Sequence, residues 1–153
     1  VLCSIKALLD LPEREYRSGL AEVVKYGVIY DAALFRRLER NHEKLLARDE
    51  QELSWVVARS CEIKADVVSQ DETESGLRAI LNFGHTIGHA IENISGYGKY
   101  LHGEAIAIGQ TAAAWISSQL TGLPEADAAR VETLFRQLKL PTRIELGERS
   151  TKR

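Results

Sequence analysis

The chain contains few cysteines and prolines, almost no excess charge, and no long apolar run. Its two cysteines, Cys3 and Cys61, form no CxxC pair and cannot build a disulfide framework, so we expect a protein of the reducing cytoplasm. A formal net charge of -2 predicts no general attraction to nucleic acid or to acidic membranes. The longest apolar stretch, residues 105–116, is too short and too interrupted for a membrane span, and we see no signal peptide.

The length, the composition and the spacing of apolar residues together predict one all-helical domain. The chain has 153 residues, of which 44% are hydrophobic and 27% are charged, as in an ordinary globular domain. Its three prolines lie at the boundaries of segments whose apolar residues recur with a helical period, and no run alternates as a strand would. We therefore expect an all-α, bundle-like domain over residues 1–146 and a polar tail over 147–153. The expected helices are 12–28, 32–46, 49–70, 77–94, 103–120 and 124–138.

Three of the four histidines lie within residues 85–102. Arg78, Asn82, His85 and His89 are spaced by 4, 3 and 4 residues, which places them on one face of the expected helix 77–94. Histidine is the commonest metal ligand in proteins. A guanidinium, an amide and two imidazoles on one face favour the binding of a polyoxygenated anion or of a metal ion.

The histidines allow several kinds of site. A zinc pair of the HExxH type is disfavoured, because Thr86 stands where that motif carries glutamate. His85 and His102 with one carboxylate and an open fourth position would form an arrangement typical of catalytic zinc. Alternatively, His85 and His89 are ordinary core or surface imidazoles, which is the usual role of a single histidine. Spacing alone does not choose among the candidate carboxylates Glu22, Glu74, Glu92 and Glu104.

Two lysines lie within largely apolar patterns. Lys64 is in line with Val57, Cys61 and Val68, so it either extends from an edge into solvent or reaches an anion in a cleft. Lys25 follows Glu22 by three residues on an expected helix. That pair is either an ordinary surface ion pair or part of a site on a mostly buried helix.

These segments together resemble the 3-dehydroquinate synthase family. The resemblance rests on Lys64 and on four segments in matching order and spacing, 11–15 (LPERE), 18–27 (SGLAEVVKYG), 78–90 (RAILNFGHTIGHA) and 101–105 (LHGEA). It extends over about residues 1–145 but covers only the C-terminal, helical half of that enzyme. The N-terminal NAD-binding domain and a late lysine-bearing segment are expected to be absent. The chain alone is therefore expected to bind metal without turning over.

The resemblance also implies ligands and a reaction. Zinc, or cobalt in its place, would be held by Glu22, His85 and His102. Substrate contacts would come from Lys25, Lys64, Arg78, Asn82 and His89, with Glu74 a carboxylate near the same site. The full-length enzyme would use NAD to convert 3-deoxy-arabino-heptulosonate 7-phosphate to 3-dehydroquinate and phosphate in the shikimate pathway. Arg78 would offer a planar fork to the substrate carboxylate, and His89 would transfer protons.

Two other classes of function remain open. One is another sugar phosphate cyclase, or a glycerol-dehydrogenase-like enzyme, with the same two-domain plan. The other is a non-catalytic helical module kept for metal binding or oligomerisation. Lys64, Arg78 and Asn82 favour a phosphorylated, acidic sugar as the binding partner, and the Ala-rich stretch 105–114 could pack against a second copy in a homodimer.

Overall fold

The computed structural model describes residues 4–71, 76–96 and 98–145. Over these ranges the chain forms helices joined by short loops, with no strand. The elements are α1 (Ile5–Leu9), α2 (Glu13–Ile29), α3 (Ala32–Leu46), α4 (Glu50–Gln70), the 3-10 helix η1 (Leu77–Asn82), α5 (His85–Ser95), α6 (His102–Leu120) and α7 (Glu125–Gln137). The all-α fold expected from the sequence is confirmed.

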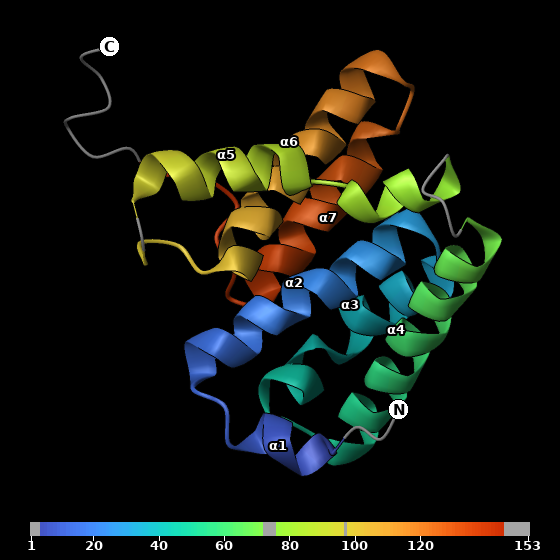
Figure 1. Ribbon diagram of the computed structural model, residues 1–153, viewed down its shortest axis with the longest axis vertical. Coiled ribbons are helices and arrows are strands. Elements are labelled where there is room, and N and C mark those ends of the chain that lie inside the picture. Colours follow the sequence, from blue (N-terminus) through green and yellow to red (C-terminus); the bar gives the residue numbers. More distant parts are fainter. Residues whose placement is uncertain (1–3, 72–75, 97, 146–153) are drawn as a thin grey trace.

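Helix α2 lies in the middle of the molecule, with α3 and α4 on one side and α6 and α7 on the other (Figure 1). Its buried face joins a core of aliphatic and aromatic side chains from α3, α4, α6 and α7. The side chains of Leu34, Leu38 and Phe135 are completely buried there. Because α2 contacts both halves of the molecule, its side chains can meet residues from distant parts of the sequence.

Two aspartates determine where helices α3 and α4 begin. Asp31 accepts hydrogen bonds from the backbone amides of Ala33 and Leu34, and Asp49 accepts one from Glu52. Such side chains satisfy the amides that the first turn of a helix leaves without partners. Apart from 77–94, every predicted helix begins and ends within one residue of the observed bounds. The five-residue helix α1 was not predicted.

The prediction of one α-helix over 77–94 is wrong. The backbone forms η1, extends at Phe83, and turns at Gly84, whose φ of 78° is in the left-handed region that favours glycine. Helix α5 then begins at His85 and packs across α6, where a side chain at Gly109 would collide with the Gly84 carbonyl oxygen. The four-residue polar stripe is therefore not a single helical face.

The apolar stripe that includes Lys64 is also not the buried face of α4. The buried apolar residues of α4 are Leu53, Val56, Ile63 and Val67, whereas Cys61 and Lys64 are exposed. The expected helical period of α4 is correct, but its buried apolar residues lie about one residue away from the predicted ones.

None of the described helices combines the length and apolar character needed to cross a bilayer. The predicted tail, 147–153, lies outside the described residues.

Candidate metal centre

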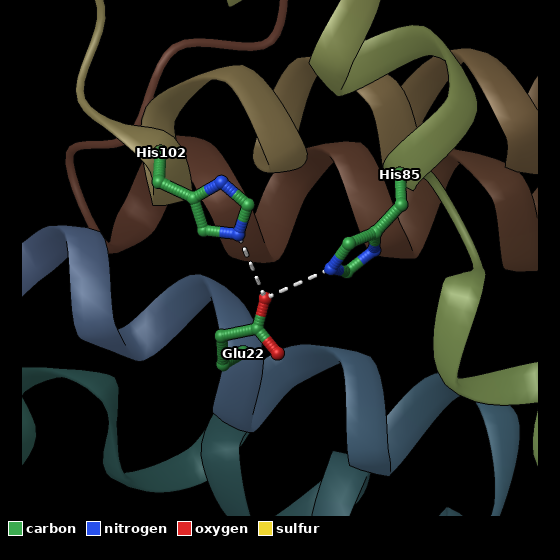
Figure 2. A group of neighbouring side chains, drawn as sticks. All are labelled: Glu22, His85 and His102. Carbon is green, nitrogen blue, oxygen red and sulfur yellow. Dashed lines mark ion pairs between the residues drawn. The ribbon is translucent and has the colours of Figure 1, made fainter.

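Three side chains from three helices meet beside α2 (Figure 2). Glu22 projects from α2, while His85 and His102 are the first residues of α5 and α6. The Oε1 atom of Glu22 lies 3.5 Å from Nε2 of His85 and 3.7 Å from Nε2 of His102. One ligand atom from each residue lies within 4.8 Å of the other two. The sequence separates these residues widely, and the α2–α6 and α5–α6 packing brings them together.

Glu22 is held by only one of its two oxygens. Its Oε2 accepts a hydrogen bond from Nζ of Lys25 at 2.6 Å, and Lys25 is buried. Its Oε1 is buried without a hydrogen-bond partner in the described part of the chain. Leaving a buried polar atom unsatisfied costs about 1–3 kcal/mol. A cation between Oε1 and the two imidazoles would offset that cost.

The spacing of these atoms suits a tetrahedral metal ion. Zinc bound at about 2.0–2.1 Å by nitrogen and oxygen holds its donors about 3.3 Å apart. The observed 3.5 and 3.7 Å separations lie close to that value. Two imidazoles and one carboxylate are also the donor set of known catalytic zinc sites, which keep a fourth position for water or substrate. The residues therefore fit a divalent transition metal.

The His85 imidazole is prepared for metal binding by its surroundings. Its Nδ1 lies 3.3 Å from the Phe83 carbonyl oxygen, which can only accept, so Nδ1 carries the proton and Nε2 faces Glu22. Burial lowers the pKa of His85; the Phe83 hydrogen bond opposes this effect, and the charge of Lys25 reinforces it. The ring is thus neutral at neutral pH, the form that ligates metals.

His102 is fixed through both its backbone and its ring. At the backbone, the Gly103 amide donates to Oγ of Ser18 at 2.9 Å, which ties the start of α6 to α2. Glu104 accepts a hydrogen bond from the Leu101 amide and two from Arg14, so this carboxylate supports the helix start rather than the metal group. At the ring, Nδ1 of His102 lies 3.2 Å from Oε1 of Glu92.

His89 completes a triangle of imidazoles but lies outside the Glu22 group. Its ring centroid is 5.6 Å from that of His85 and 5.7 Å from that of His102. Its Nδ1 lies 2.9 Å from Oε2 of Glu92, and its side chain is largely exposed. His89, Glu92 and His102 thereby form a second cluster whose atoms are close enough for a metal, but hydrogen bonds already occupy it.

A cleft of about 340 Å³ opens beside the metal group. Lys64 reaches it from α4, and Arg78 and Asn82 reach it from η1, although no common helical face aligns them. The remaining lining residues are Glu22, Lys25, Tyr26, Leu81, His85 and His102. Four of the five predicted substrate-contacting residues, Lys25, Lys64, Arg78 and Asn82, therefore lie around one cleft. His89 lies beside it, and Glu74 is outside the described residues.

The chain matches a known protein family over most of its length. Residues 19–152 match the family described as 3-dehydroquinate synthase C-terminal. This chain belongs to that family. The resemblance inferred from the sequence motifs is thereby confirmed, and the three candidate ligands lie within the matched residues.

Individual relatives support the same assignment. A 3-dehydroquinate synthase of Geobacter sp. (strain M21) is 52% identical over 144 residues, which are 94% of this chain and 40% of the relative. A chloroplastic 3-dehydroquinate synthase of Arabidopsis thaliana is 55% identical over 142 residues, 93% of this chain and 32% of the relative. The chain thus spans about 40% or less of the length of these two curated relatives.

Among solved structures, the chain is similar to a 2-epi-5-epi-valiolone synthase of Streptomyces hygroscopicus subsp. jinggangensis 5008, which has NAD+ and Zn2+ bound. The TM-score is 0.84 at 28% identity, and the match covers 92% of this chain and 39% of the other. The arrangement of helices is therefore that of one part of a larger enzyme.

Proposed function

We propose that this chain is the metal- and substrate-binding domain of a 3-dehydroquinate synthase, a carbon–oxygen lyase. The whole protein would convert 3-deoxy-arabino-heptulosonate 7-phosphate to 3-dehydroquinate and phosphate. The observation that carries the proposal is the buried Oε1 of Glu22, which has no hydrogen-bond partner among the described residues and faces Nε2 of both His85 and His102. The relatives that bear the name 3-dehydroquinate synthase support it.

In this proposal Glu22, His85 and His102 hold one zinc ion, or cobalt in its place, and leave a position open toward the cleft. The Zn2+ bound in the similar valiolone synthase supports this choice. Zinc bound there would ligate substrate hydroxyls and lower the pKa of the one to be oxidised. Lys25 assists by holding Oε2 of Glu22, which keeps Oε1 directed at the histidines.

The charges around the cleft suit an acidic, phosphorylated sugar. Among the described residues that line it are three cations, Lys25, Lys64 and Arg78, and one carboxylate, that of Glu22. Such an excess of positive charge attracts an anionic ligand. We assign Arg78 to the substrate carboxylate, because its planar guanidinium can bind both oxygens at once. The Arg78 backbone amide donates to Oδ2 of Asp71 at 2.9 Å, which anchors the start of η1 beside the cleft.

The remaining predicted residues take part in proton transfer and polar contacts. Asn82 would donate a hydrogen bond to a phosphate or hydroxyl oxygen without adding charge. His89, which lies beside the metal group and is accessible to solvent, would move protons to and from a substrate hydroxyl. We keep Glu74 as a further carboxylate of the site.

We place the NAD site in the part of the relatives that this chain does not span. NAD would accept a hydride from the substrate and return it. On this proposal residues 1–146 supply metal and substrate contacts, and the chain alone binds ligands without turnover. A cytoplasmic location is proposed on the cysteine usage, and a plant relative is named chloroplastic.

Metal and ligand binding test this proposal on the 153-residue chain. We expect one zinc ion per chain by calorimetric titration and elemental analysis, and its loss in Glu22→Gln. The variant Arg78→Ala should still bind zinc but should no longer bind 3-deoxy-arabino-heptulosonate 7-phosphate. A chain that stays metal-free at saturating zinc would refute the metal site, and loss of zinc in Arg78→Ala would refute the division of roles.

The alternative within the same structural class is another sugar phosphate cyclase, which the similarity to a valiolone synthase favours. The two differ in whether the site requires a substrate carboxylate. Binding of the heptulosonate phosphate should be at least tenfold tighter than binding of a sugar phosphate of equal length without the carboxylate. Equal binding of the two compounds would favour the alternative.

A further inference from the structure

Glu92 on α5 contacts two histidines at once. Its Oε2 lies 2.9 Å from Nδ1 of His89, and its Oε1 lies 3.2 Å from Nδ1 of His102. The first contact joins neighbouring turns of one helix, whereas the second joins α5 to the first residue of α6. A single carboxylate therefore connects the candidate metal ligand His102 to His89, which is not a member of the Glu22 group.

These contacts determine which nitrogen of each ring carries the proton. An ionised carboxylate only accepts hydrogen bonds, so each imidazole donates from Nδ1. In the neutral ring Nε2 then keeps its lone pair. For His102 that atom is the one 3.7 Å from Oε1 of Glu22, on the metal side. For His89 it is an atom of a largely exposed ring, able to accept a proton from a ligand.

We propose that Glu92 is a positioning residue with two roles, which rest on the proposed function. It orients His102 so that Nε2 faces the metal, and it holds His89 in the tautomer that serves as a base toward the substrate. Carboxylates that accept the second N–H of a metal-bound histidine fix the ring and raise its basicity. Here the same carboxylate also holds His89, the imidazole proposed to act on the substrate. Glu92 would therefore orient both a metal ligand and the residue that transfers protons.

Glu104, a carboxylate two residues from His102, does not have this geometry. Glu104 accepts from the Leu101 amide at 2.8 Å and from Arg14, so it fixes the backbone at the start of α6 and not the imidazole ring. Its replacement should disturb the helix start without changing a tautomer. The alternative for Glu92 itself is that His89, Glu92 and His102 ligate a second cation. The number of ions bound distinguishes that alternative from the positioning role.

The first measurement needs no variant. Long-range nitrogen–proton NMR spectra of the metal-free chain report which nitrogen of each imidazole is protonated. We expect the neutral form of His89 and that of His102 to be the Nδ1–H tautomer. Predominantly Nε2–H rings at either position would overturn the proposal. Because no metal is required, this measurement tests Glu92 even if the chain fails to bind zinc, an outcome that would refute only the proposed function.

The second measurement compares zinc affinity in matched variants. Glu92→Gln should weaken zinc binding by about 10- to 100-fold at one ion per chain, because its amide cannot accept from both rings. It should also shift the tautomer of at least one of the two histidines, because the amide oxygen can accept from one ring only, and Glu92→Asp should restore part of each signal. The control is Glu132→Gln on α7, which loses a bridging carboxylate bonded to Trp115 and Arg136; it should change neither.

Two results would contradict the positioning role. Zinc affinity within twofold of the wild-type chain in Glu92→Gln, with both tautomers unchanged, would show that Glu92 does not orient the rings. Two zinc ions per wild-type chain, one of which is lost in Glu92→Gln, would show that Glu92 is a ligand of a second site. Circular dichroism of each variant establishes that the helices are retained, and if Glu92→Gln does not fold, the wild-type tautomers decide.

Discussion

Charged side chains on the two sides of α2 are satisfied in different ways. On the α3–α4 side, Arg37 donates two hydrogen bonds to the buried Glu52, at 2.7 and 2.9 Å, and both carboxylate oxygens are used. On the α5–α6 side, Glu22 uses one oxygen for Lys25 and leaves the other buried and unpartnered in the described chain. Both oxygens of Glu52 are therefore paired within the fold, whereas one oxygen of Glu22 has no hydrogen-bond partner among the described residues, which suits the metal ion proposed above.

The largest expected effect comes from removing the unpartnered oxygen. Glu22→Gln should weaken zinc binding by more than about 100-fold, beyond the range for residues that only support a ligand. The matched change on the other side, Glu52→Gln, should leave zinc affinity unchanged within twofold. Calorimetric titration measures both. An equal loss of zinc affinity in the two variants would remove the distinction between the two sides.

The next largest effect should come from substitutions that disturb the packing at the start of α6. A side chain at Gly103 would collide with the carbonyl oxygen of Ser18, so Gly103→Ala should lower the free energy of unfolding by about 1–3 kcal/mol and displace His102. Gly19, on the exposed face of α2, has nothing within 4 Å of an added Cβ. Gly19→Ala should therefore raise the free energy of unfolding by about 0.5–1 kcal/mol. Urea denaturation of the metal-free chain checks both signs.

On the α3–α4 side of α2, loss of the Glu52 carboxylate should lower the stability of the fold without changing zinc affinity. Glu52→Ala leaves the Arg37 guanidinium, which also stacks on Trp55 at 4.0 Å, without its carboxylate. We expect the free energy of unfolding to fall by about 1–3 kcal/mol, the cost of an unsatisfied charged group that is partly shielded from water. Zinc affinity of the folded variant should not change. A drop in zinc affinity would show that the two sides of α2 are coupled.

The smallest effect concerns Asp31, the N-cap of α3. Partial burial raises the pKa of Asp31, but hydrogen bonds from the Leu34 amide and the Arg59 guanidinium outweigh burial and lower that pKa below 3.8. The ionised carboxylate therefore contributes stability above pH 3.8, and this contribution is lost as the pH falls through its folded-state pKa.

Asp31→Asn, which keeps the cap, should cost about 0.5 kcal/mol near neutrality, the worth of a partly exposed ion pair. The difference from the wild-type chain should vanish in acid. Thermal unfolding from pH 2 to 7 measures it, and a difference that persists unchanged at the lowest pH would contradict the assignment.

The sequence patterns predicted the helix bounds well where interactions between residues close in the sequence determine them. Asp31 and Asp49 mark helix starts because their side chains bond the first free amides, and those helices were predicted to within one residue. The break at Phe83 and Gly84 depends on how closely α5 approaches α6 at Gly109, which is a contact between distant residues. Spacing alone could not reveal it, because an uninterrupted α-helix fits the same residues.

The candidate site was predictable in part. Spacing offered His85 and His102 as one of several possible sites, and the family resemblance favoured that pair and supplied its carboxylate, Glu22. The contact between Glu92 and His89 follows from their separation of three residues on a helix. The contact between Glu92 and His102 depends on how α6 returns along α5, so no local pattern indicates it.

Anomalous diffraction at the zinc absorption edge, from crystals of the chain grown with zinc, locates the bound metal ion directly. We expect one strong peak within about 2.0–2.3 Å of Oε1 of Glu22 and of Nε2 of His85 and His102. A zinc-loaded crystal with no peak between these three atoms, or with its peak between His89 and Glu92 instead, would contradict it.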